Sequence, residues 1–312
     1  MGLEHFWGGI SPIPYPLKRL KGTKMKVAIF MLFGQSNATG HGVPMSDTDI
    51  IKEPLKNVWG LNREPNQSFD TERLKFSRYT SYGMNLAENQ DNTYSVANCL
   101  AKHWQNEIDS GADLPDLYVI QIAIGGQGVY GMWSPNREKK LIRGKLEDVN
   151  ISLYPYSLHI LSLLKEHLDR CQIEADYIGL HWRGGEREFW QHIDNLRNED
   201  RLKNTYKTLI GGWRDALKCD FPIVLHKLNF EGLLKGLENG KHIPSMNYIN
   251  EVYSDLCKEL PNISMFDSLN APHYDPENGY SLFRWDMVHY NPETNDWVAR
   301  EIIKDYKAKR NI

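Results

Sequence analysis

The feature that most constrains the fold is a regular alternation of short apolar runs with longer helical patterns. Five runs have the length and apolar content of buried strands, at 26–33, 116–124, 176–182, 221–228 and 263–266. Strands separated by helices are typical of a mostly parallel sheet with right-handed crossovers and helices on both faces. The sequence therefore predicts an α/β fold, a three-layer α/β/α sandwich around a five-stranded sheet.

Between these runs, apolar residues recur every three or four positions, the periodicity of a helix with one buried side. Such patterns cover 96–108, 156–170, 202–217 and 249–256, and a last one includes Trp297 and Tyr306. A predicted helix thus precedes each predicted strand after the first. This order is the one that parallel strands require, because each crossover needs a long connection.

The 312 residues suffice for one large α/β domain or two average ones. No internal repeat, low-complexity tract or charge block divides the chain, so we expect a single domain over 26–312, preceded by an N-terminal extension over 1–25. The stretch from about 41 to 90 is too long for an ordinary strand-to-helix connection. We expect it to be an insertion over the edge of the sheet at which the parallel strands end and ligands bind.

Charge and composition argue against several classes of partner. The chain has 37 Lys and Arg against 40 Asp and Glu, a formal net charge of −3, so no basic excess favours nucleic acid. The longest apolar stretch, 27–33, is far shorter than the roughly 20 residues that cross a bilayer, so membrane insertion is not expected. No signal-peptide pattern occupies the first 24 residues, and a cytoplasmic location is the default expectation. The oligomeric state is not indicated.

Motifs for metals and cofactors are missing from the sequence. There is no CxxC, HxxxH or HExxH spacing. We therefore expect neither a metal site nor a cofactor.

A serine follows the first predicted strand directly, in the segment Gly34-Gln35-Ser36-Asn37. Ligands of parallel sheets bind at the carboxyl ends of the strands, so a hydroxyl at this place can act as a nucleophile. Gly34 would give the backbone the freedom to present it. The alternative is that Ser36 caps a helix and Gly34 belongs to a turn.

An aspartate and a histidine three residues apart, Asp286 and His289, stand just before the last predicted helix. At that spacing the carboxylate can turn back to the imidazole, fix its tautomer and stabilise the imidazolium that forms when His289 takes a proton from Ser36. The three residues then form a triad. Taken alone, the pair could equally cap the last helix.

Two further segments follow predicted strands and contain paired glycines. The first, 125–128, reads GGQG, and its backbone N–H groups could face a developing oxyanion. The second, 182–188, reads WRGGERE, and its glycines beside a carboxylate indicate a shaped loop. The alternative for 125–128 is a flexible turn, and the alternative for 182–188 is a routine connection.

These segments, in this order and over residues 26 to about 300, resemble the SGNH/GDSL hydrolases, and in particular the sialate O-acetylesterase-like branch with the family six carbohydrate esterases. The matching residues are GQSN at 34–37, the glycine pair at 125–126, WRGGE at 182–186 and DMVH at 286–289. The resemblance implies that Ser36 is the nucleophile, His289 the general base and Asp286 its orienting carboxylate.

The resemblance also implies the remaining site residues. The oxyanion hole would use backbone N–H groups of Ser36 and of Gly126 or Gly125, while Glu186 would brace the loops around the nucleophile and Asn37 belongs to the same motif. Gly184 stands where the family has a glutamine that donates to the oxyanion. Loss of one such donor costs about 10²–10³ in rate unless it is replaced.

Arg183 and Gln127 are the two candidates for a substitute donor. A guanidinium would bind an oxyanion strongly, and could also pair with a carboxylate of the substrate. The alternative for Arg183 is a surface salt bridge.

Aromatic residues cluster in the same segments and suit a sugar substrate, although core packing accounts for part of them. They are Tyr130, Trp133, Trp182, Phe189, Trp190, Tyr274, Tyr280 and Trp285. The resulting hypothesis is a serine esterase that removes an acetyl group from a sugar or polysaccharide. The alternative is a catalytically weak carbohydrate-binding or acyl-transfer protein on the same fold.

Overall fold

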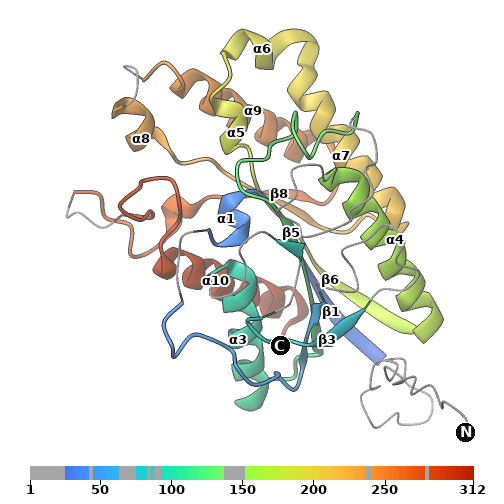
Figure 1. The fold of residues 1–312 in the computed structure, drawn as a ribbon. Coiled ribbons are helices and arrows are strands. Elements are labelled where there is room, and N and C mark those ends of the chain that lie inside the picture. Colours follow the sequence, from blue (N-terminus) through green and yellow to red (C-terminus); the bar gives the residue numbers. More distant parts are fainter. Residues whose placement is uncertain are drawn as a thin grey trace, which may run out of the picture.

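The structure is a computed structural model that describes residues 25–41, 45–62, 75–82, 86–87, 93–136, 152–236, 240–277 and 281–312. Its centre is one twisted sheet, with strands in the order β3-β2-β5-β1-β6-β7-β8 and β4 paired to β5 (Figure 1). The predicted N-terminal extension lies outside the described residues, apart from Met25.

All five predicted strands are present and mutually parallel. They are β1 (Met25–Gly34), β5 (Asp116–Ala123), β6 (Ile173–Arg183), β7 (Ile223–His226) and β8 (Ile263–Phe266). The α/β class and the mostly parallel sheet are therefore confirmed.

The predicted count of five strands is wrong, because the insertion supplies three more to the described part of the sheet. They are β2 (Val58–Leu61), β3 (Phe76–Arg78) and β4 (Leu86–Ala87). β2 and β4 run parallel to β5, whereas β3 is antiparallel to β2. β3 and β4 have only three and two residues, and Gly60 interrupts the apolar run of β2, so none of the three stands out as a buried strand in the sequence.

Helices cover both faces of the sheet, as the predicted three layers require. One face packs against α4 (Leu153–Cys171), α7 (Arg201–Leu217) and α9 (Ile243–Glu259), and the other against α3 (Val96–Asp109) and α10 (Pro292–Arg310). The described short helices are α1 (Ser36–Thr39), α5 (Glu186–Phe189), α6 (Ile193–Arg197) and α8 (Glu231–Gly236), with 3₁₀ turns at Asn198–Asp200 and Ser268–Asn270. None of the described helices is long and apolar enough to span a membrane.

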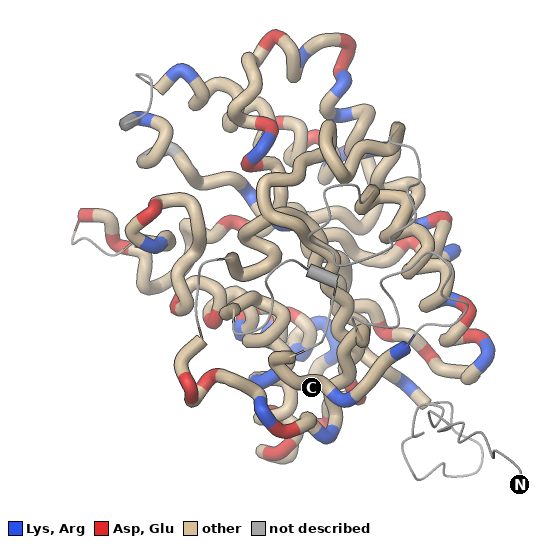
Figure 2. Tube along the Cα trace, viewed as in Figure 1, with Lys and Arg blue, Asp and Glu red and all other residues tan. Residues whose placement is uncertain are grey.

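The central strand β1 is buried on both faces, which explains why its sequence over 27–33 is apolar throughout and does not alternate with polar residues. Its successive side chains enter two different cores, Val27, Ile29, Met31 and Phe33 on the α4 side, and Ala28, Phe30 and Leu32 on the α3 side. A strand buried on both faces has no polar position. In Figure 2, charged residues of both signs are interspersed along the outer helices and loops, and few lie on the central strands.

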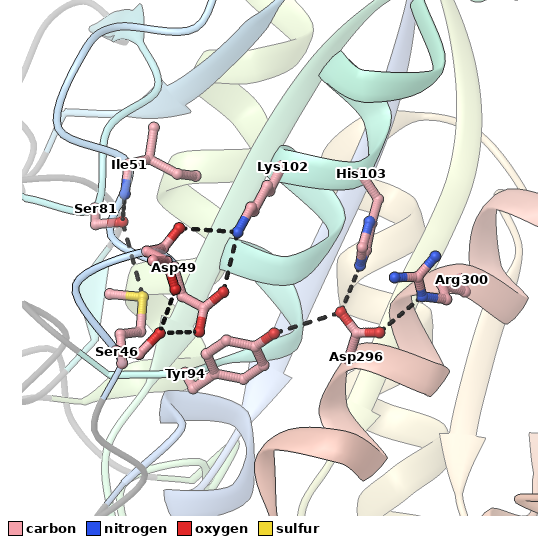
Figure 3. A network of polar contacts seen from close by, with 11 residues as sticks. Ser46, Asp49, Ile51, Ser81, Tyr94, Lys102, His103, Asp296 and Arg300 are labelled. Carbon is pink, nitrogen blue, oxygen red and sulfur yellow. Dashed lines mark hydrogen bonds and ion pairs between the residues drawn. The ribbon is translucent and has the colours of Figure 1, made fainter. Parts of the chain in front are cut away.

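Polar contacts tie the insertion and the last helix to α3 (Figure 3). In the insertion, the Asp49 carboxylate accepts a hydrogen bond from Lys102 Nζ of α3 at 3.0 Å. On α10, the Asp296 carboxylate contacts His103 Nε2 of α3 at 2.5 Å and accepts from Arg300 Nε at 2.7 Å. Through Lys102 and His103, α3 thus contacts both the insertion and α10.

Candidate active site

Ser36 begins α1 immediately beyond β1, at the carboxyl edge of the sheet. β1 lies between β5 and β6 in the sheet. Strands that come later in the chain therefore stand on both sides of β1, and the strand order changes direction here. Such a switch point leaves a crevice beyond the strands, where ligands of open α/β sheets bind. The fold therefore puts the predicted nucleophile where ligands of such sheets bind.

The turn that carries Ser36 is held tightly against β6. Gly34 has φ +148°, and a Cβ added there would lie 2.0 Å from the carbonyl oxygen of Arg183. Only glycine permits this approach. The Gln35 N–H donates to the same carbonyl at 3.0 Å, and the Trp133 indole N–H donates to the Gly34 carbonyl at 3.0 Å. The serine thus stands on a turn fixed from two neighbouring strands.

Glu186 braces this turn with both of its oxygens. Its buried carboxylate accepts from Gln35 Nε2 at 3.0 Å and from Asn37 Nδ2 at 2.8 Å. It belongs to α5, which follows β6. Glu186 is thus hydrogen-bonded to the side chains of both neighbours of Ser36.

The segment 284–289 forms a compact turn that presents Asp286 and His289. The Arg284 N–H donates to the His289 carbonyl at 2.9 Å, and the Met287 N–H donates to the Arg284 carbonyl at 2.9 Å. Met287 adopts the left-handed region with φ 56°. Asp286 Oδ1 accepts the backbone N–H groups of Val288 at 3.0 Å and His289 at 2.9 Å.

Asp286 and His289 also contact each other through their side chains. Asp286 Oδ2 lies 3.0 Å from His289 Nδ1. Burial raises the pKa of Asp286, but the hydrogen bonds from His289 and Val288 outweigh it and leave the pKa below its ordinary value. The carboxylate is therefore ionised near neutral pH and favours the tautomer in which Nδ1 carries the proton.

Asn37 joins the serine turn to the histidine turn. Its Nδ2 donates to the Val288 carbonyl at 3.1 Å, and its Oδ1 accepts the Tyr290 N–H at 3.1 Å. These two residues flank His289, so one side chain next to Ser36 holds both sides of the histidine. Among the described residues, no hydrogen bond joins the Ser36 hydroxyl to the His289 imidazole. Hydrogen bonds between catalytic groups are often long without substrate and shorten when it binds.

The glycine segment after β5 lies beside the serine turn. Gly34 pairs with Ala123 in the parallel register, so Ser36 and Gly125 each stand two residues beyond that pair on adjacent strands. Gly126 has φ 68° and is exposed. The predicted oxyanion segment thus follows β5, the strand next to the one that Ser36 follows.

Comparison with known proteins agrees with this arrangement at the level of the fold. No family model and no curated protein matches the sequence. The crystal structure of NanS aligns with a TM-score of 0.58 and 16% identity, covering 92% of this chain and 99% of that one. A protein from Arabidopsis thaliana aligns with a TM-score of 0.55 and 15% identity, covering 90% and 98%. At 15–16% identity, this chain shares the α/β fold of these two structures.

Within this fold, Arg183 occupies a different place from the one expected. Its side chain is 2% exposed and stacks on the Tyr290 ring at 4.4 Å. Its Nη1 donates to the Asn37 carbonyl at 3.1 Å and to Asn295 Oδ1 at 2.8 Å. The guanidinium thus supports the serine turn from behind, and neither a surface salt bridge nor a contact with substrate suits this burial.

Gly184 has no room for the glutamine that the sequence resemblance would put there. A Cβ at this position would lie 2.7 Å from the indole of Trp182, which is fully buried in the core. The Gly184 carbonyl accepts the Tyr253 hydroxyl at 2.9 Å, which fixes the backbone. Gln127 turns toward its own loop, because its Oε1 lies 3.1 Å from where a Cβ of Gly131 would be. Neither predicted substitute donor is thus seen to face Ser36.

The predicted aromatic cluster divides between core and surface. Trp133, Trp182 and Phe189 are buried and belong to the core, and Tyr280 lies outside the described residues. Trp190 is partly exposed, whereas Trp285 is 85% exposed on the turn that carries His289. Tyr130 and Tyr274 are half-buried. Trp285 is therefore the most exposed member of the described cluster, and it lies on the turn that carries two of the three triad candidates.

Sequence reasoning missed two residues beside the site. The His41 ring lies 5.1 Å from the His289 ring between centroids. Glu188 is fully buried against the 125–128 segment. Neither has a spacing motif that would reveal it, because each reaches the site only through folding.

A separate hollow of about 850 Å³ lies between α3 and α10. Its charged residues are already paired, for example Lys102 with Asp49 and Lys307 with Glu107. It contains none of the three triad candidates. In the described part of the chain, no group of three or more potential metal ligands is found.

Proposed function

We propose that this protein is a serine esterase that removes an O-acetyl or other small acyl group from a carbohydrate, without a cofactor. One observation carries the proposal. Asn37, next to Ser36, is hydrogen-bonded to both neighbours of His289, and His289 is hydrogen-bonded to Asp286. Nucleophile, base and orienting carboxylate are thereby assembled from opposite ends of the chain at one sheet edge.

In the first half-reaction, Ser36 Oγ attacks the acyl carbonyl while its proton passes to His289 Nε2. The negative charge moves to the carbonyl oxygen, which the backbone N–H groups of Ser36 and Gly126 stabilise. When the intermediate collapses, the bond to the sugar oxygen breaks and that oxygen takes the proton from His289. Asp286 stabilises the imidazolium in between.

In the second half-reaction, His289 takes a proton from a water molecule that attacks the acyl-Ser36 ester. Collapse of this intermediate returns the proton to Ser36 Oγ and releases the carboxylic acid. The overall reaction consumes one water molecule and leaves the sugar hydroxyl free.

A carbohydrate is the favoured substrate class because of Trp285. An indole that is 85% exposed on the triad turn offers a flat face on which a sugar ring can stack. The solvent-exposed position leaves room for a long chain, so an acetylated polysaccharide would fit as well as a single sugar.

The decisive experiment compares the wild type with Ser36→Ala in hydrolysis of an activated acetyl ester, with labelling by a fluorophosphonate. We expect turnover and an adduct at Ser36 in the wild type, and loss of both in the variant. Ser254→Ala, on α9, is the matched control and retains both. A folded wild type that shows neither turnover nor adduct would refute the proposal.

Gly184 supports a second candidate function, a weak esterase that acts mainly in sugar binding or acyl transfer. Gly184 has no side chain, and a Cβ there would meet the Trp182 indole, so two backbone donors remain for the oxyanion. Product analysis in the presence of a free sugar distinguishes the two functions. Acylated sugar in excess of free acid indicates transfer, and acid alone indicates hydrolysis.

A further inference from the structure

The short helix α5 carries two carboxyl groups that lie against different parts of the site. Glu186 contacts the serine turn, as described above. Glu188, two residues later, is fully buried and lies against the 125–128 segment. A Cβ added to Gly128 would stand 1.8 Å from Glu188 Oε1, so the carboxyl occupies the space that a side chain there would take.

The surroundings of Glu188 offer no compensating cation. In the described part of the chain, no ion pair involves its carboxyl oxygens, and neither oxygen has a side-chain hydrogen-bond partner. The groups that face it come from four elements: the N–H groups of Val129 and Tyr130 with the Tyr130 phenol after β5, Tyr206 on α7, Tyr253 on α9 and Glu186 on α5. Burial raises the pKa of Glu188 to about 7, Glu186 raises it too, and the two N–H groups oppose them.

A buried carboxyl without a cation to pair with lowers stability, so its place beside the candidate oxyanion segment calls for an explanation. The surface it contacts is the backbone that follows Gly126, the candidate oxyanion donor. An ionised carboxyl attracts the N–H groups of Val129 and Tyr130 and draws this backbone toward α5.

We propose that Glu188 is a positioning residue that sets the 125–128 segment, and with it the Gly126 N–H, relative to Ser36. This inference rests on the proposed function. Through its two carboxyl groups, α5 then supports both halves of the site, Glu186 the nucleophile turn and Glu188 the oxyanion segment.

The first test is Glu188→Gln, which keeps the shape and removes the charge. We expect kcat for an activated acetyl ester to fall roughly 10- to 100-fold, with KM within about twofold, because a misplaced donor acts on the transition state. Thermal stability at pH 8 should rise at the same time, since a buried charge is removed. A residue that merely supports the fold would lower stability and activity together.

A second variant tests the contact from its other side. Gly128→Ala places a methyl group where the carboxyl lies, and we expect a similar loss of kcat. Because both changes break one contact, the double variant should lose less than the product of the two single losses. If the double variant instead loses kcat by the product of the two single losses, the two changes act independently and the proposed contact is contradicted.

A measurement without substrate separates this proposal from the proposed function. Amide hydrogen exchange in 125–130 should be faster in Glu188→Gln, whereas Ile210→Val, a core change on α7, should leave both this segment and kcat unchanged. Wild-type exchange and wild-type kcat in Glu188→Gln would overturn the proposal. If the wild type is neither labelled by the fluorophosphonate nor able to hydrolyse the ester, the proposed function fails. Faster amide exchange of 125–130 in Glu188→Gln would still support the positioning role in that case.

Discussion

Asn37 shows how one side chain can assemble a site from distant segments. It contacts Glu186 after β6 and the two neighbours of His289, which follow it by about 250 positions in the chain. Its amide group supplies two donor contacts and one acceptor contact, a combination that neither a carboxylate nor an aliphatic side chain can offer.

We expect Asn37→Asp to lower kcat roughly 10- to 100-fold, because the serine and histidine turns separate. The aspartate loses both donor contacts and faces the Glu186 carboxylate, so the free energy of unfolding should also fall by about 1–3 kcal/mol. Steady-state kinetics and urea unfolding measure the two effects. The matched control is Asn229→Asp, which meets the Asp267 carboxylate away from the triad and should lose stability without losing kcat. Equal kinetic losses in both variants would contradict the role of Asn37.

The buried Glu188 carboxyl makes a prediction about stability and pH. Its pKa is raised from 4.5 to about 7 in the folded state, mainly by burial. A raised carboxyl pKa means that the folded state prefers the protonated form, so this group costs stability progressively from about pH 4.5 to pH 7. Glu188→Gln should therefore match the wild type near pH 4.5 and exceed it by about 1–3 kcal/mol at pH 8. Unfolding by urea at both values tests this, and a gain confined to low pH would have the wrong sign.

At the scale of elements, the 284–289 turn both carries His289 and exposes Trp285. Backbone hydrogen bonds and the left-handed Met287 define the turn that carries His289. The same turn leaves Trp285 85% exposed. A large apolar side chain held exposed beside a candidate triad is the surface on which we expect the sugar to bind.

We expect Trp285→Ala to raise KM for an acetylated oligosaccharide about tenfold, since ring contacts of this kind contribute about 0.5–1.5 kcal/mol beyond the area they bury. Hydrolysis of a small activated ester should remain as in the wild type, because that substrate does not reach the indole. Tyr82→Ala removes an exposed aromatic side chain of the insertion and serves as control. Equal effects on the large and the small ester would contradict stacking.

At the scale of the whole molecule, the last helix is tied to the central sheet through Asp176 of β6. Its carboxylate accepts from Tyr306 Oη at 2.9 Å and from Arg310 Nε at 2.6 Å, both on α10, and pairs with Lys26 Nζ at 3.2 Å. Burial raises the pKa of Asp176, but these partners outweigh it and lower the pKa to about 2. The end of the chain is thus joined to two adjacent strands, β1 and β6.

A lowered carboxyl pKa adds stability that is present above the unfolded pKa and is lost as the pH falls toward the folded value. For Asp176 that window runs from about pH 4 to about pH 2. Asp176→Asn should therefore lower the free energy of unfolding by about 2 kcal/mol at pH 7, and the difference should shrink in acid. Urea unfolding at pH 7 and pH 3 measures it. Asp169→Asn, which breaks an exposed pair with Lys165, should change stability by less than about 0.5 kcal/mol.

The sequence by itself determined the elements and their class. Buried strands and amphipathic helices follow from local apolar periodicity, which is readable wherever an element is long enough. The place of Ser36 was equally readable, because a parallel sheet puts every post-strand segment at one edge. The pairing of Asp286 with His289 spans only three residues, so it too was accessible.

Only the tertiary structure decided the rest. The three short strands of the insertion depend on the edge of β5, and Arg183 is buried because Tyr290 and Asn295 arrive from the far end of the chain. The closed space at Gly184 and the contact of Glu188 with Gly128 likewise depend on how β6 and its loops pack. Contacts between residues so far apart are determined by register and close packing, which local sequence patterns do not encode.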